Sequence, residues 1–169
     1  ILKQRDLMLS LVITALGYGA SFPVYTYLTT ILGKAGWSTS LIVVLLIAYG
    51  LAVAIGNVAG GRFANLNPLG ALTKMFAALA LVMLVMIFGI SAHVVGLILV
   101  LAMGLLAFMN VPGLQLYTMQ IAEDKLPEDA QLASSLNISF FNIGIMIGSF
   151  SGGQIVNQLG LMWTPIAGL

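Results

Sequence analysis

The side chains in this sequence that could do chemistry are amides, hydroxyls and aromatic rings set within long apolar segments. Amides are costly in hydrocarbon unless they are hydrogen-bonded, so within a membrane they mark contact with another helix or with a polar solute. Four of the amides in these segments are our candidates: Asn110, Gln115, Asn137 and Asn142. Both interpretations stay open for each of them, because a bond between helices would satisfy the amide as well as a solute would.

The first apolar segment adds a stripe of aromatic and hydroxyl groups. At helical spacing, five side chains fall within about 100° of arc: Tyr18, Ser21, Phe22, Tyr25 and Thr29. Pro23 lies among them and favours a kink or a local break, because it lacks a backbone donor. Such a face suits a cavity for an amphipathic or sugar-like solute, and the alternative is a packing face between helices. Later segments add two further aromatic candidates, Tyr49 and Phe141.

The inventory of reactive groups excludes most enzyme and metal chemistry. The sequence has no cysteine and one histidine, which excludes a thiolate site and a multi-histidine metal cluster. His93 stands beside Ser91, where we expect an external turn, and no carboxylate falls inside a full apolar segment. An intramembrane protease needs a base or two acids at that depth. We therefore expect no enzyme activity, no cofactor and no metal, and any proton carrier must lie elsewhere.

The composition requires a lipid environment. The chain is 60% hydrophobic and 7% charged, with a mean hydropathy of +1.10, whereas a soluble domain carries about 25% charged residues. A net charge of +1 gives no basic footprint for nucleic acid. We expect the bilayer to solvate an all-α protein, because unpaired backbone groups are costly in lipid and no barrel pattern is present.

Five runs are long enough for a membrane helix of about 20 residues. The 48 residues after Lys74 lack Asp, Glu, Lys and Arg; as one helix they would span about 72 Å, so a turn is required near 91–93. A sixth run starts near residue 160 and is cut short at 169. The expected fold is a six-helix bundle with a truncated last helix, and its full spans are 7–32, 40–61, 69–90, 94–120 and 131–157.

Lysine and arginine set the expected orientation, because cytoplasmic loops carry an excess of both. With the N-terminus in the cytoplasm, Lys34 lies outside, and five cationic residues lie inside: Lys3, Arg5, Arg62, Lys74 and Lys125. We therefore expect a multi-pass protein of the inner (plasma) membrane. The chain opens without methionine, which suggests a start within a longer protein.

A repeated motif closes two of the runs. Residues 55–65 and 147–157 lie 92 positions apart and match at five of eleven positions, three of them glycine. Under the expected topology the two copies lie on opposite sides of the membrane, which predicts an inverted repeat with units 1–90 and 91–169. Glycine ridges let helices approach closely, and we assign helix packing or gating to Gly56, Gly60, Gly61, Arg62, Gly144, Gly148 and Gly152. For Arg62, an anchor at the headgroups and a gate latch are both open.

These residues resemble a known family. Four stretches are similar to the C-terminal half of a twelve-span major facilitator transporter, in the drug:proton antiporter group with the arabinose- and sugar-efflux permeases and purine-nucleoside exporters: 22–28, 56–62, 111–115 and 136–144. The resemblance implies spans seven to eleven and the start of twelve, with a cavity between the first, second, fourth and fifth spans of this chain. Asn65 stands where the family usually has an aspartate, so the resemblance does not extend to a charge latch at that loop.

The resemblance also implies a function and a partner. We expect half of a secondary transporter that exports a small solute (a sugar, a nucleoside or a drug-like molecule) by proton antiport and alternating access. The missing N-terminal six-helix half would be its partner and would carry the coupling acids. The alternative is a non-transporting assembly or receptor subunit, because packed glycine faces would serve it equally well.

Overall fold

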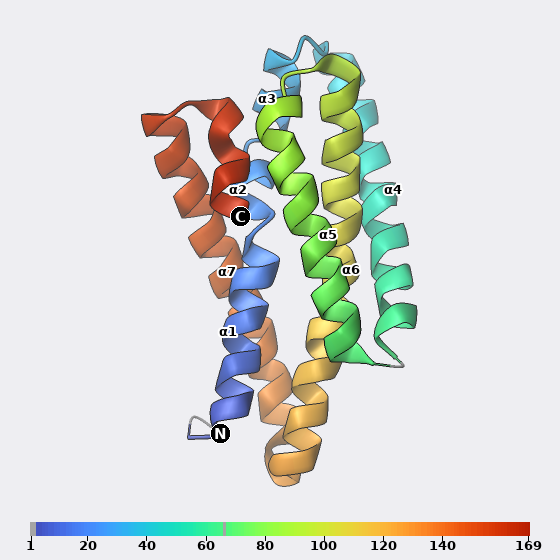
Figure 1. Ribbon diagram of the computed structural model, residues 1–169, viewed down its shortest axis with the longest axis vertical. Helices are drawn as coiled ribbons and strands as arrows, with labels where there is room; N and C mark the ends of the chain where they lie inside the picture. Colours follow the sequence, from blue (N-terminus) through green and yellow to red (C-terminus); the bar gives the residue numbers. More distant parts are fainter. Residues whose placement is uncertain (1–2, 66) are drawn as a thin grey trace.

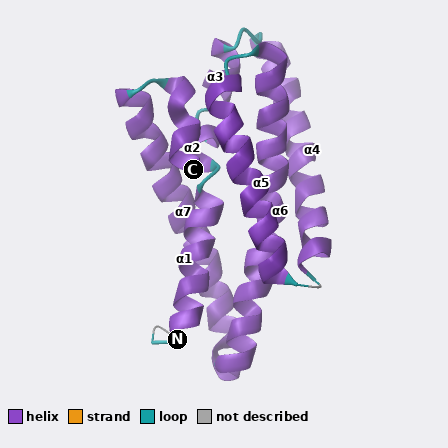
Figure 2. Cartoon of the chain, viewed as in Figure 1, coloured by secondary structure: helices purple, strands orange, loops and turns teal. Residues whose placement is uncertain are grey.

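The computed structural model describes residues 3–65 and 67–169, and this part of the chain is helical with no strand (Figures 1 and 2). The elements follow in this order: α1 (Arg5–Gly19), α2 (Phe22–Tyr25), α3 (Leu28–Lys34), α4 (Thr39–Ala64), α5 (Pro68–Gly89), α6 (His93–Lys125), η1 (Pro127–Asp129), α7 (Ala130–Gln158) and η2 (Leu161–Gly168). The two η segments are 3₁₀ helices. The all-α class expected from composition is confirmed.

Five segments of the described chain are long and apolar enough to cross a membrane: Arg5–Lys34, Thr39–Ala64, Pro68–Gly89, His93–Lys125 and Pro127–Gln158. They confirm the five full spans expected from the sequence. The main difference is the fourth span, which continues to Lys125 instead of ending at 120. Those last residues carry charge, so they extend the helix beyond the apolar stretch that the sequence pattern detects.

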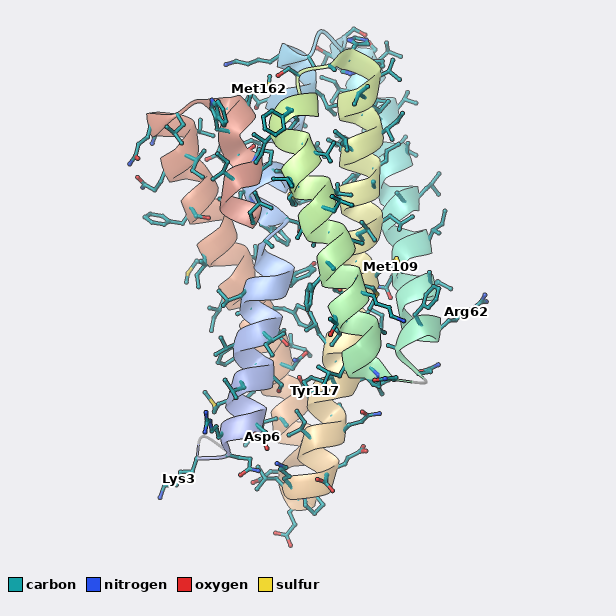
Figure 3. All side chains as sticks on the ribbon, in the orientation of Figure 1. Lys3, Asp6, Arg62, Met109, Tyr117 and Met162 are labelled. Carbon is teal, nitrogen blue, oxygen red and sulfur yellow. The ribbon has the colours of Figure 1, made fainter. Side chains whose placement is uncertain are left out.

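The long segments alternate in direction along the bundle (Figure 1). The N-terminus, the α4–α5 turn and the α6–α7 turn lie at one end, and the turns after α3, α5 and α7 lie at the other. Arg62, in the last turn of α4, therefore lies at the end opposite to Gln154, near the end of α7. Figure 3 shows Lys3 and Arg62 toward the same end of the bundle. This arrangement of the two motif copies agrees with an inverted repeat.

The first span is broken, as Pro23 predicts. Helix α1 ends at Gly19, and α2 is a single turn that stops at Tyr25 before α3 resumes at Leu28. Because Pro23 has no N–H, Gly19 O loses the donor four residues ahead that a continuous helix would supply. At the second interruption, Tyr27 has a non-helical ψ of 12°. The break places Phe22 to Thr26 in a short segment with its own direction.

The apolar core has its largest part toward the end opposite the N-terminus. There, side chains of α3, α5 and α6 pack together around Ile31, Met83, Met86 and Met103, all essentially inaccessible. A smaller cluster around Leu7 and the facing Ala122 and Ala133 joins α1, α6 and α7 at the N-terminal end. Between them lies an aromatic cluster that contributes to the candidate site.

Glycines hold two helix pairs in backbone contact. On α4, a Cβ at Gly56 or Gly60 would collide with the carbonyl group of Leu105 or Met109 on α6. On α7, a Cβ at Gly148 would collide with the carbonyl of Gly19 on α1. We call these contacts the α4–α6 seam and the α1–α7 seam. Only a residue without a side chain permits such an approach.

The two seams are related by constant shifts in numbering. Gly56 and Gly60 on α4 correspond, 92 residues later, to Gly148 and Gly152 on α7, and Gly152 packs on Pro23. Gly56 and Gly60 contact Leu105 and Met109 on α6. These two positions stand 86 residues after Gly19 and Pro23, which Gly148 and Gly152 contact. Equivalent glycines therefore meet equivalent positions of the partner helix, and the inverted repeat appears in the packing as well as in the sequence. The unit boundary near residue 90 stays a prediction.

The last segment differs in detail from a regular span. Leu161–Gly168 forms the 3₁₀ helix η2 after Gly160, whose φ is +99°. Pro165 inside it cannot donate a backbone hydrogen bond. Gly168 packs against Ala20 O and Met83 Sδ, so η2 lies against the break of the first span and against α5.

Candidate solute groove

An edge-to-face chain of aromatic rings runs through the middle of the bundle. The Tyr18 ring contacts Phe22, Phe108 and Phe141, with centroid distances of 5.2, 5.7 and 4.8 Å. Phe22 in turn contacts Tyr25 at 5.4 Å. Edge-to-face pairs of this kind contribute about 0.5–1.5 kcal/mol each beyond the area they bury. The rings come from three separated spans, so they fix α1, α6 and α7 relative to one another.

The chain of rings ends at an open groove. Tyr25 is 44% exposed and stacks on Tyr49 of α4, which is 6% exposed, at 5.6 Å and 28°. The Tyr25 ring is therefore held by a buried neighbour while part of it stays accessible. An accessible aromatic face with fixed orientation can stack on a flat or ring-shaped solute.

The groove has a volume of about 450 Å³ and is lined by aromatic, aliphatic and hydroxyl groups: Phe22, Tyr25, Thr26, Leu28, Thr29, Leu46, Ile145 and Ser149. The hydroxyls of Thr26 and Ser149 are hydrogen-bonded to each other at 2.9 Å across the break of the first span and α7. Each hydroxyl can donate one bond and accept others. The lining can therefore bind an uncharged solute with both rings and hydroxyl groups.

Asn137 lies outside this groove, in a buried hydrogen-bond network between three helices. Its Nδ2 donates to Thr14 Oγ1 of α1 and to Thr118 Oγ1 of α6, both at 2.9 Å. Thr118 Oγ1 donates to Ser10 Oγ at 3.3 Å. Asn137 is 1% exposed, and its Oδ1 has no partner in the described chain. This network, which we call the Asn137 network, ties α1, the C-terminal part of α6 and the N-terminal part of α7 together.

The other amides take three different positions. Asn110 is fully buried on α6, where its Nδ2 donates to Leu106 O one turn back. Asn142 is exposed on α7 and donates to Ile138 O. Gln115 lines a second open groove of about 380 Å³ at the end that carries the N-terminus. The structure therefore does not bring the four amides into one site.

The second groove shares its lining with the glycine motif of α4. Gly61 and Asn65 face Pro112 and Gln115 of α6 there, with Ser134 of α7 opposite. The Arg62 side chain points away from the bundle (Figure 3) and has no acidic partner within the described residues. Asn65 is exposed beside it. The arginine latch considered from the sequence therefore has no partner on the described chain.

The remaining candidates lie next to the aromatic rings or the seams. Ser21 is buried, and its hydroxyl donates to Tyr18 O at 3.3 Å, so it caps the break of the first span. Gly144 packs on the backbone of Ala15, and Gly152 packs on Pro23. These glycines bring α7 close enough to α1 for the contact between Phe141 and Tyr18.

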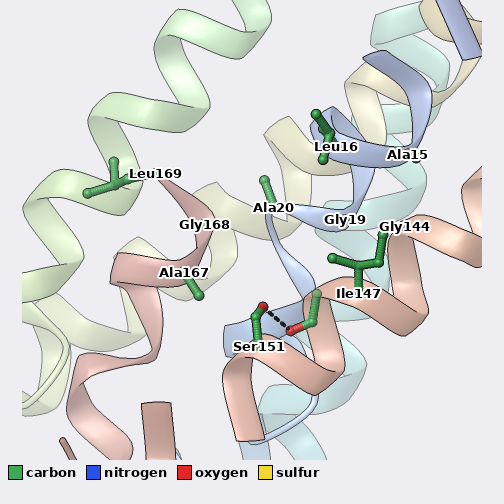
Figure 4. A pocket seen from close by; sticks show the side chains of 11 residues that line it. Ala15, Leu16, Gly19, Ala20, Gly144, Ile147, Ser151, Ala167, Gly168 and Leu169 are labelled. Atoms are coloured by element: carbon green, nitrogen blue, oxygen red, sulfur yellow. Dashed lines mark hydrogen bonds between the residues drawn. The ribbon is translucent and has the colours of Figure 1, made fainter. Parts of the chain in front are cut away.

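A further pocket of about 290 Å³ lies between α1, α7 and η2 (Figure 4). Its walls are backbone and small aliphatic groups, including Gly19, Gly144 and Ala167. The Ser151 hydroxyl in it already donates to Gly148 O at 2.9 Å. This pocket therefore presents few free hydrogen-bonding groups, in contrast to the groove at Tyr25.

Within the described residues, no three His, Cys, Asp or Glu side chains gather where they could hold a metal ion. His93 lies at the start of α6, at the end of the bundle away from the N-terminus. Its ring stacks on Trp37 at 3.8 Å, and its Nδ1 is 2.7 Å from Ala35 O. The structure places His93 at the turn between α5 and α6, and the external side of the membrane stays a prediction for that turn.

The sequence pattern does not indicate some of the polar side chains that the structure places at the groove and in the Asn137 network. Thr26 had not been singled out, and neither had Ser10, Thr14 and Thr118 of the Asn137 network. Ser10 and Thr14 stand four residues apart in an apolar span, which is the one signal that could have indicated a shared polar face. Their partners lie more than 100 positions away in the chain, so the spacing alone does not reveal the network.

Comparison with known proteins gives a consistent set of relatives. YtbD of Bacillus subtilis strain 168, an uncharacterized MFS-type transporter, is 47% identical over 169 residues, which is 99% of this chain and 43% of the relative. YdhP of Escherichia coli K12, an inner membrane transport protein, is 31% identical over 99% of this chain and 43% of its own length. A protein of Mannheimia succiniciproducens named "Probable sugar efflux transporter" is 26% identical over 95% of this chain and 40% of its own.

The chain thus spans less than half the length of the curated relatives it matches. No family model and no solved structure matches it. The fold, the alternating apolar spans and the seams define a multi-pass helical membrane bundle. Because the match to these transporters extends along nearly its whole length, the chain belongs to the major facilitator superfamily. These relatives are transport proteins and not enzymes, in line with the chemistry excluded above.

Proposed function

We propose that this chain is the C-terminal half of a secondary transporter that exports a small solute, and that the groove at Tyr25 contributes to its solute site. The observation that carries the proposal is the groove itself, which presents a held aromatic face beside the Thr26 and Ser149 hydroxyls at the break of a membrane span. Broken helices at the interface of inverted repeats are typical of transporter binding sites. The name of the Mannheimia relative supports a sugar as one solute class.

The missing N-terminal half closes the groove in this proposal. The groove opens on the surface of the described chain, so a second bundle is needed to enclose a solute. Rocking of the two halves gives alternating access, with the N-terminus of this segment in the cytoplasm. We propose repeat units 1–90 and 91–169, which divide at the turn between α5 and α6.

Proton antiport completes the proposal, with its acidic carrier on the other half. The spans of this chain contain no carboxylate apart from those at their ends, which are Asp6, Glu123, Asp124, Glu128 and Asp129. The role of this half is therefore to bind and orient the solute.

The test is solute flux with the full-length protein in liposomes under an imposed pH gradient. We expect flux of a sugar, a nucleoside or an amphipathic drug, and we expect Tyr25→Leu to raise the apparent KM about two- to tenfold, the equivalent of one aromatic contact. Asn142→Ala tests the exposed amide of α7 in the same assay. Phe88→Leu, on an 83% exposed side chain of α5, is the matched control.

Two results would reject the proposal in different ways. Flux equal to that of empty vesicles for all three solute classes would favour a non-transporting assembly or receptor subunit. Normal kinetics for Tyr25→Leu, with transport intact, would remove the groove from the solute site and leave the transport activity standing. Normal kinetics for Asn142→Ala would remove that amide, which lies outside the groove lining.

A further inference from the structure

An apolar crevice lies on the outside of the bundle, away from the groove at Tyr25. It has a volume of about 220 Å³ and is formed where α4 and α5 both pack against α6. Its walls include Phe63 of α4, Leu106 and Met109 of α6, and Ala71, Lys74 and Ala78 of α5. The α5 residues recur at helical spacing, so they form one stripe along the crevice. We call it the α4–α5 crevice.

Small side chains create this crevice. Ala71 and Ala78 are two helical turns apart on α5, and neither fills the space that a larger residue would occupy. The crevice exposes almost only carbon, with Lys74 as its one charged residue. An apolar channel with a cation beside it complements a molecule that has an aliphatic chain and a negative head.

The depth of the crevice matches one leaflet of a bilayer. Phe63 belongs to the last turn of α4, and Lys74 belongs to the second turn of α5, so both lie near the end of their spans. Ala78 lies ten residues into α5, about 15 Å along the axis and half the thickness of the hydrocarbon core. The adjacent outward face of α5 is apolar and exposed at Leu81, Leu84 and Phe88. The crevice therefore runs from headgroup level into the hydrocarbon.

The charge of Lys74 has no internal counterpart. The sequence contains no Asp or Glu between residues 7 and 122, which covers the whole of α4 and α5. Within the described chain, the ion pair is Lys125 with Asp6, which joins α1 and α6. Lys74 is exposed, so its ammonium group can reach the headgroups while its stem lies along the apolar wall.

We propose that the α4–α5 crevice binds one phospholipid with an anionic headgroup. One acyl chain lies against Ala71, Ala78 and Leu106, and the Lys74 ammonium donates hydrogen bonds to the headgroup phosphate. The apolar walls bind the chain of any phospholipid, and the unpaired charge of Lys74 selects for net negative charge. A lysine near a membrane surface favours an anionic lipid by about fivefold. This site does not depend on the transport function proposed above.

The test uses the full-length protein in nanodiscs, with phosphatidylglycerol and phosphatidylcholine of identical acyl chains as probes. Native mass spectrometry measures how many lipids of each kind stay bound. We expect one retained phosphatidylglycerol, with about a fivefold preference that Lys74→Gln removes. Lys34→Gln removes a charge at the opposite end of the bundle and keeps the preference.

A second pair of variants tests the shape of the crevice. Ala78→Leu fills it and abolishes lipid retention, whereas Ala77→Leu, the same change on the neighbouring exposed residue, leaves retention unchanged. Equal retention of both lipids by the unmodified protein would overturn the proposal. So would normal retention by Ala78→Leu.

Photolabelling of the unmodified protein does not depend on any variant folding. Phosphatidylglycerol with a diazirine in its acyl chain should label peptides from Ala71–Ala78 and Leu106–Met109 above the level reached with labelled phosphatidylcholine. Labels spread evenly over all exposed faces, or equal labelling by both lipids, would mean that the crevice holds only bulk lipid and would refute the site.

Discussion

The adjacent glycines Gly60 and Gly61 on α4 should respond in opposite ways to the same substitution. A Cβ at Gly60 would lie 2.7 Å from both Cα and the carbonyl carbon of Met109 and closer still to its carbonyl oxygen. A Cβ at Gly61 would lie 3.8 Å from Pro112 Cβ, an ordinary contact. Gly60→Ala therefore pushes on the backbone of α6, whereas Gly61→Ala does not.

The size of the effect follows from these distances. To reach an ordinary carbon–carbon contact at Gly60, the two helices must separate by roughly 0.7 Å or more, because backbone cannot rotate away as a side chain can. Overpacking of this kind costs about 1–3 kcal/mol. Alanine also gains up to about 1 kcal/mol of helix propensity over glycine, and this gain is common to both variants. The two free energies of unfolding should therefore differ by about 1–3 kcal/mol.

Reversible unfolding of the full-length protein in mixed detergent micelles measures this difference. Gly61→Ala should be as stable as the unmodified protein or slightly more stable, and Gly60→Ala should be less stable than Gly61→Ala by the amount above. Equal stability of the two variants would refute the close approach of α4 to α6. It would also remove the physical basis of the α4–α6 seam.

Two further predictions concern polar contacts at the N-terminal end of the bundle. Asn137→Ala should lower the free energy of unfolding by about 1–2 kcal/mol, because Thr14 and Thr118 lose their donor in a buried site. The control Asn142→Ala should change it by less than about 0.5 kcal/mol, because that amide donates only to the backbone of its own helix. The reverse order would contradict the Asn137 network. Lys125→Gln should leave the thermal unfolding midpoint unchanged at physiological salt, because the pair with Asp6 is exposed and screened, and a large fall in that midpoint would show that the pair is protected from solvent.

The sequence could predict the spans because lipid imposes a simple rule on them. Each crossing needs a continuous apolar stretch, and charges mark the turns after α3, α4 and α6, whereas the turn at 91–93 follows from the length limit on a membrane helix. The break near Pro23 was predictable because proline removes a backbone donor, although the same loss leaves α6 continuous through Pro112. The repeated glycines likewise indicated close helix contacts before any packing was known.

The groove and the polar network needed the structure. Asn110 and Asn137 are polar residues within apolar spans, as solute-binding residues often are. Both are buried, however, and Asn137 donates hydrogen bonds to two other helices. A lone sequence does not distinguish an amide that bonds a helix from one that bonds a solute, because the cost of burial is the same for both. Thr26 had no distinctive spacing, and its contact with Ser149 depends on how the break turns the chain.

The seams determine where this bundle can change shape. Carbonyl groups in contact with glycines leave no space for α4 to slide along α6, or for α7 to slide along α1, since any shift would bring Cα atoms into carbonyl oxygens. The first span is joined differently, through interruptions at Ala20–Ser21 and at Thr26–Tyr27. Bending is therefore concentrated in the segment that carries Phe22 and Tyr25, so a bend there would move the aromatic lining of the groove.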